Sequence, residues 1–119
     1  IFNTFQTMKP ETDDNIIHVK ISPVYERRIA FLENLMVVEC DFKNGPMENP
    51  DPPHSHPHEQ ITYVAEGELL FFKGEKEYHL RRGDMITVSS GILHCIQTIS
   101  NHVRLIDSFH PVRKDFLKQ

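Results

Sequence analysis

Short β-prone segments separated by turn residues run along most of this chain, and this alternation limits the folds that it can adopt. Between residues 36 and 42 the apolar residues Met36, Val38 and Cys40 fall on every second position, which is typical of a strand with one buried face. The same reading predicts strands over residues 15–21, 27–33, 35–42, 61–65, 69–72, 77–80, 85–88, 94–99 and 103–109. No segment has a sustained helical period, and one helical turn is expected within residues 110–117. The pattern predicts an all-β sandwich or barrel, of which the jelly roll is one case.

A length of 119 residues suits a single domain, and we expect an N-terminal lead-in over residues 1–14 followed by one domain over 15–119. The net charge of -4 offers no basic face for nucleic acid, and no apolar run is long enough to span a membrane. The two cysteines, Cys40 and Cys95, are too few for a secreted disulfide framework and are expected to be buried thiols. The N-terminal residues lack the features of a signal peptide, so a cytoplasmic protein is expected.

A histidine-rich run, His54-Ser55-His56-Pro57-His58-Glu59-Gln60, precedes the segment that begins at residue 61. In an extended chain His54 and His56 point to the same side, so their imidazoles can share a metal ion. Gln60 and His58 have the same parity, whereas Glu59 does not. Spacing alone therefore leaves the ligand set open, and a His-rich surface loop without a metal is the alternative.

Two motifs in this chain resemble those of the cupins. The first is His54-x-His56-x-x-x-Gln60, followed six residues later by Glu66-Gly67-Glu68. The second is Gly83-Asp84, followed by Ser90-Gly91-x-x-His94. The resemblance covers roughly residues 27–117 and implies a small jelly-roll barrel that holds one divalent transition metal on His54, His56, Gln60 and His94. Nickel, zinc, iron and manganese are all compatible with such a site.

The chain departs from the usual cupin pattern at three positions. Gln60 stands where Glu is usual, Ser89 where proline is common, and Thr98 where asparagine often closes the second motif. The carboxamide of Gln60 cannot neutralise any of the metal's charge. The site should therefore act as a strong Lewis acid, which favours non-redox chemistry over an oxygenase.

Within the cupins, the histidine run and residues 105–117 resemble the pectin-degradation cupins of the KdgF type. Those enzymes convert the 4,5-unsaturated monouronates left by pectin or alginate breakdown into linear keto-uronates, by ring opening and tautomerisation. The resemblance implies catalytic roles for Asp107 and Arg113 and substrate binding by Phe109 and Arg113. Asp107 would then be the acid/base, Arg113 would hold the substrate carboxylate and Phe109 would form an apolar wall. A non-redox, isomerase-type enzyme acting on a small sugar acid is therefore expected.

Several alternatives remain open at this point. The chain could be a non-catalytic cupin that binds a sugar or another small molecule, or a metal-dependent dioxygenase. Asp107 and Arg113 could simply form an ion pair, and Phe109 could be a core residue. Tyr63 and His18 could also line the barrel, whereas His58 and Glu59 are expected at its rim. A homodimer that pairs through residues 15–42 is expected, with no nucleic-acid or membrane partner.

Overall fold

The computed structural model describes residues 4–118, and it consists of strands and two short 3-10 turns within that range. The strands are β1 (Ile16–Ser22), β2 (Tyr25–Phe31), β3 (Met36–Phe42), β4 (Glu59–Glu66), β5 (Glu68–Lys73), β6 (Lys76–Arg81), β7 (Met85–Val88), β8 (His94–Thr98) and β9 (Val103–His110). The turns are η1 (Pro10–Thr12) and η2 (Lys114–Leu117). The predicted all-β class is confirmed, with most strand bounds within two residues of those expected. No helix in the described range is long and apolar enough to cross a membrane.

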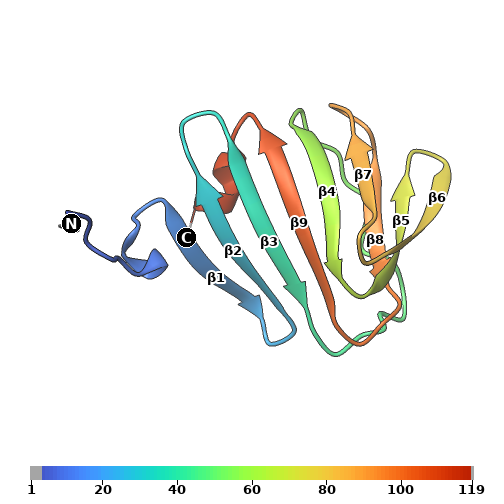
Figure 1. Cartoon of the computed structure of the whole chain (residues 1–119). Coiled ribbons are helices and arrows are strands. Elements are labelled where there is room, and N and C mark those ends of the chain that lie inside the picture. The colour runs from blue at the N-terminus through green and yellow to red at the C-terminus, as the bar shows by residue number, and fades with distance from the viewer. Residues whose placement is uncertain (1–3, 119) are drawn as a thin grey trace.

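The strands form two antiparallel sheets, and Figure 1 shows the chain passing from the larger sheet to the smaller one after β4. The larger sheet has the order β1-β2-β3-β9-β4-β7, and the smaller has the order β6-β5-β8. Buried residues of both sheets join one core, among them Ile29, Val38 and Val64 from the larger sheet and Leu69 and Phe71 from the smaller. The two inner faces therefore pack against each other, as in the jelly-roll barrel that was predicted.

The register of β3, β9 and β4 places polar side chains side by side on the inner face of the larger sheet. Asp107 in β9 lies opposite Val38 in β3 and opposite Thr62 in β4. Two residues along, Phe109 lies opposite Gln60. All of these positions are buried, so the polar groups among them need hydrogen-bond partners within the protein.

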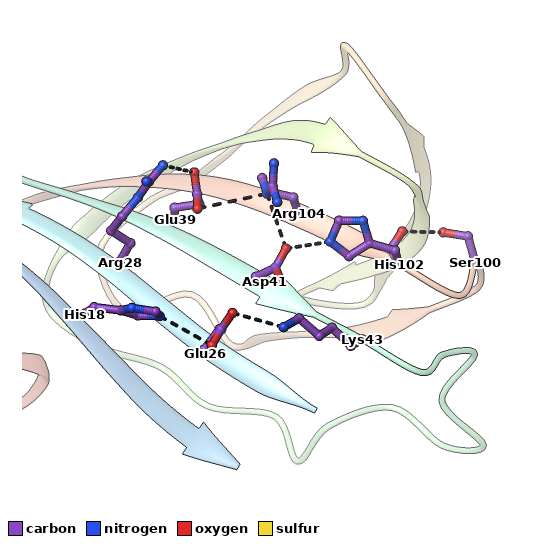
Figure 2. A network of polar contacts seen from close by, with 9 residues as sticks. All are labelled: His18, Glu26, Arg28, Glu39, Asp41, Lys43, Ser100, His102 and Arg104. Atoms are coloured by element: carbon purple, nitrogen blue, oxygen red, sulfur yellow. Dashed lines mark hydrogen bonds and ion pairs between the residues drawn. The ribbon is translucent and has the colours of Figure 1, made fainter. Parts of the chain in front are cut away.

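The outer face of the same sheet is charged, and Figure 2 shows ion pairs that run across its strands. Arg28 in β2 pairs with Glu39 in β3 at 2.9 Å. Arg104 in β9 pairs with Asp41 in β3 at 3.2 Å. The exposed Arg28–Glu39 pair contributes about 0–1 kcal/mol, whereas Asp41 is buried and needs the partners that Arg104 and His102 provide.

The histidine run is not part of a continuous strand, because β4 begins only at Glu59. The preceding proline-rich segment, residues 43–53, lies antiparallel beside β8 and is tied to it by isolated backbone hydrogen bonds. These are donated by the amides of Met47, Asp51 and His54 to the carbonyls of Thr98, Ile96 and His94, over 3.1, 2.9 and 3.0 Å. Prolines lack the amide hydrogen that a regular ladder needs. The parity argument for an extended chain therefore applies only from Glu59 onward, and His54 reaches the site by pairing with His94.

Gly67 alone joins β4 to β5, and therefore one sheet to the other. It has a φ of 85°, and a Cβ atom added to it would lie 2.1 Å from the backbone carbonyl oxygen of His102. Gly74 also has a positive φ, of 61°, but an added Cβ there would meet nothing within 4 Å. Replacing Gly74 by alanine therefore costs only the backbone strain, whereas replacing Gly67 costs that strain and a steric clash.

We expect Gly67→Ala to lower the free energy of unfolding by about 3–4 kcal/mol, because it adds a steric clash to the left-handed backbone strain. Gly74→Ala, the matched control, should cost about 1 kcal/mol, from the backbone alone. Urea denaturation of both variants at equal metal content measures the difference. If both variants lose the same free energy of unfolding, the clash at Gly67 does not contribute.

Candidate functional site

Three histidines from separate parts of the chain meet at one end of the barrel. His54 and His56 belong to the loop before β4, and His94 is the first residue of β8. One ring nitrogen of each lies within 4.8 Å of the others, an arrangement that could hold a metal ion. The backbone bonds between His54 and His94, at 3.0 and 2.9 Å, bring the two motifs into contact.

Backbone carbonyls fix how the rings of His94 and His56 are protonated. The Nδ1 atom of His94 donates to the carbonyl of Ile92 at 2.8 Å, and that of His56 donates to the carbonyl of His58 at 3.0 Å. In a neutral ring the Nε2 atom then carries a free lone pair. The Nε2 atom of His94 is buried and has no hydrogen-bond partner within residues 4–118.

An orphaned, buried lone pair of this kind needs an explanation, and a bound metal ion is the one that fits three convergent imidazoles. Burial also lowers the pKa of His94 to about 4. Burial and the neighbouring His56 lower the pKa of His54 as well. Both shifts favour the neutral rings of His54 and His94, the form that metal ligation requires. The residues present fit a metal site.

A chain of hydrogen bonds leads from this cluster into the barrel. The side-chain amide of Gln60 donates to the hydroxyl of Thr62 at 2.9 Å, and that hydroxyl donates to Oδ1 of Asp107 at 2.6 Å. The other end of the Gln60 side chain, Oε1, faces Nε2 of His56 at 3.0 Å. Thr62 therefore fixes which end of the Gln60 amide points toward the histidines.

A cavity of about 610 Å³ occupies the space between the sheets, large enough for a monosaccharide. Its lining includes His54, Gln60, His94, Asp107, Phe109 and Arg113, so six of the seven residues predicted from the sequence share this one space. The seventh, His56, belongs to the histidine group beside it. The structure thus brings the predicted residues together, although their individual roles stay predictions.

Asp107 is 9% exposed, and burial raises the pKa of its carboxyl group. The hydrogen bonds from Thr62 and from the thiol of Cys40 oppose this shift. Oδ1 accepts the strong bond from Thr62, whereas Oδ2 lies 3.5 Å from the weakly donating sulfur of Cys40. Oδ2 is therefore the oxygen that is freer to exchange a proton with a bound molecule.

Arg113 does not pair with Asp107, so the alternative of a simple ion pair between them is wrong. Its guanidinium group holds Asp115 through two contacts, of 2.8 and 3.4 Å, and stacks over the ring of Phe116. Phe109, only 2% exposed, packs edge-on against Phe116 and also lines the cavity. It is thus both a core residue and a wall of the site.

The two further residues considered for the barrel lining lie outside it. Tyr63 falls on the exposed face of β4, and His18 is an exposed partner of Glu26 on the outer face of the larger sheet (Figure 2). Their positions follow from strand alternation, because both share parity with outward-facing neighbours.

The residues that line the cavity but were not predicted from the sequence include Tyr25, Arg27, Cys40 and Thr62. A usable signal was present for Arg27, which has the same parity in β2 as buried Ile29 and so had to face inward. Thr62 likewise shares its parity in β4 with Gln60 and so faces inward. An inward-facing polar residue is informative because it needs a partner or a ligand.

Comparison with known proteins agrees with this geometry. Residues 41–109 match the cupin domain family. The pectin degradation protein KdgF of Dickeya dadantii (strain 3937) is 35% identical over 91 residues, which cover 75% of this chain and 79% of that protein.

Solved structures also resemble the chain. KdgF from Halomonas sp. has a TM-score of 0.75 at 25% identity, covering 93% of this chain and 99% of that one. An RmlC-like cupin from Shewanella frigidimarina NCIMB 400 has a TM-score of 0.74 at 29% identity, covering 87% and 90%. The chain therefore belongs to the cupin family and is a homologue of the pectin degradation protein KdgF.

Proposed function

We propose that this cupin converts 4,5-unsaturated monouronates from pectin or alginate breakdown into linear keto-uronates. The homology to KdgF supports the substrate class. The observation that carries the proposal is the buried carboxyl group of Asp107, which lines the same cavity as two of the three convergent histidines. A proton-transfer group beside a candidate metal site is the arrangement that such an isomerisation needs.

In this proposal His54, His56, Gln60 and His94 hold one divalent transition metal. The place of Gln60 in the set is supported by its contact with His56. Nδ1 of His56 already donates to a carbonyl, so Nε2 is an acceptor, and Oε1 of Gln60 is an acceptor too. Two acceptors 3.0 Å apart repel each other unless a cation lies against both. When bound, the metal would act as a Lewis acid that polarises sugar oxygens.

The chain's own residues would then move the protons. Opening the hemiacetal breaks the bond between the ring oxygen and C1: the anomeric hydroxyl loses its proton as C1 becomes an aldehyde, and the ring oxygen gains a proton and becomes the hydroxyl of an enol. The enol becomes a ketone when this hydroxyl loses its proton and C4 gains one. Oδ2 of Asp107 would carry that proton. Because burial raises the pKa of Asp107, a larger fraction of the group is protonated near neutral pH than for an exposed aspartate. Phe109 would exclude water from one side of the sugar.

We expect the purified protein, with its metal content measured, to accelerate the loss of the ultraviolet absorbance of a 4,5-unsaturated galacturonate. Asp107→Asn should lower kcat by a factor of about 10²–10⁴, the usual contribution of an acid/base group. Ser108→Ala, on the outward side of the same strand, is the matched control and should retain full activity.

Other functions give different outcomes in the same assay. Absence of acceleration by the metal-loaded protein would refute the proposed reaction. Sugar binding measured by calorimetry without any turnover would instead favour a non-catalytic cupin. Turnover that stops under anaerobic conditions would favour a dioxygenase.

We expect Thr62→Val to weaken metal binding by a factor of about 10–100, because the Gln60 amide then loses the hydroxyl that fixes its orientation. Thr62→Ser keeps that hydroxyl and should bind metal as the native protein does. Competition with a chelator measures the affinity independently of catalysis. Equal affinities for the Val and Ser variants would show that Gln60 needs no such anchor.

We also propose a cytoplasmic homodimer that pairs through residues 15–42. The two cysteines are free and buried, in keeping with a reducing compartment. A second hollow of about 730 Å³ lies on the outer face of the larger sheet, and its apolar lining includes Ile16, Ala30, Val37 and Ile106. Charged residues, among them Arg28 and Glu39, share this lining, and an apolar patch with a charged rim suits a subunit contact.

Light scattering should therefore give twice the chain mass for the native protein. Val37→Asp should give a monomer, because it places a charge in the proposed contact. Ile99→Asp, which adds the same charge at an exposed site beyond β8, is the control and should remain dimeric. A native protein that is monomeric at high concentration would rule out this contact.

A further inference from the structure

Arg27 is a positive charge on the inner face of the larger sheet. It lies opposite Cys40 in the register of β2 and β3, and it lines the same cavity as Asp107 and His94. Its Nε atom donates to the hydroxyl of Tyr25 at 2.9 Å. Its guanidinium carbon lies 3.9 Å from the centroid of the Phe116 ring. These contacts hold the side chain in place but leave its terminal nitrogens available.

Arg113 lies beside the same ring, and its guanidinium carbon is also 3.9 Å from the centroid of Phe116. The two guanidinium carbons are therefore no farther apart than twice that distance. Like charges this close repel each other, more strongly in a partly buried site than in water. An anion near both would relieve that repulsion.

The two arginines differ in how their charge is balanced. Arg113 forms a two-point contact with the carboxylate of Asp115. Arg27, although half-buried, forms no ion pair with any residue between 4 and 118. A half-buried charge without a counter-ion is costly, and an anionic ligand in the cavity would remove that cost.

Asp107 does not supply the missing counter-charge by direct contact. Its two oxygens are engaged by Thr62 and Cys40 rather than by an arginine. Burial raises its pKa even with Arg27 and Arg113 nearby, so its ionised form is less favoured than that of an exposed aspartate. The positive charge of Arg27 thus remains available to a bound molecule.

We propose that Arg27, and not Arg113, is the main anchor for the carboxylate of a sugar-acid substrate. The planar fork of a guanidinium matches a carboxylate with two parallel hydrogen bonds. Arg113, held by Asp115, instead positions Phe116 and adds long-range attraction. This assignment rests on the proposed function, because it takes a uronate as the ligand.

The test compares the binding of D-galacturonate with that of its neutral methyl ester, by calorimetry, to protein with a measured metal content. The native protein should bind the acid at least tenfold more tightly than the ester. Arg27→Met should abolish that preference, and Arg113→Met should keep most of it. Arg28→Met is the matched control, since the neighbouring Arg28 lies on the outer face and pairs with Glu39 (Figure 2). It should behave as the native protein does.

The same measurements contain the results that would overturn the proposal. These are a native protein without the preference, Arg27→Met with the preference intact, or Arg113→Met as the variant that loses it. If Arg27→Met fails to fold, Arg27→Gln, which keeps a donor for Tyr25, gives the same readout. A native protein that prefers the acid through Arg27 but does not turn over the unsaturated uronate would refute the proposed reaction and leave Arg27 as a carboxylate anchor.

Discussion

Two backbone hydrogen bonds between His54 and His94 are the interaction on which the site depends. They join a loop before β4 to the start of β8, 40 positions farther along the chain, and so bring the two sequence motifs to one place. The rest of the loop runs beside β8 with only scattered bonds, because four of its residues are prolines. The imidazoles of His54 and His94 therefore lie close together because their backbones are paired.

A second constraint is the register of β3, β9 and β4, which sets what faces the histidines from inside the barrel. Opposite positions in this register place Thr62 beside Asp107, and two residues along β4 from Thr62 lies Gln60. The resulting hydrogen-bond chain connects an amide near the histidines to a buried carboxyl group. A slip of β4 by one residue would turn Gln60 and Thr62 to the outer face, away from Asp107 in β9, so register and function are specified together.

Much of this was predictable from the sequence, since strand alternation and turn residues were enough for the fold class and nearly all strand bounds. The four proposed metal ligands lie together because the two motifs meet, and Asp107 and Phe109 face the same cavity because β9 pairs with β4, while the roles of all seven proposed site residues stay predictions. Parity in an extended chain could not place His54, because residues 54–58 lie in a loop before β4 that contains Pro57. The pairing of Arg113 with Asp115 could not be foreseen, because it depends on how the tail folds over Phe109. Arg27 was overlooked because it belongs to no motif, although its parity with Ile29 placed it inside.

The proline-rich loop has a consequence beyond the site. β8 is an edge strand of the smaller sheet, and a free edge exposes amide and carbonyl groups that another chain can pair with. The loop takes up several of those groups, while its own prolines offer few donors for a further strand. The segment that delivers His54 therefore also covers this edge of the sheet, so a change among the eleven residues 43–53 would affect both the metal site and the exposure of β8 to other chains.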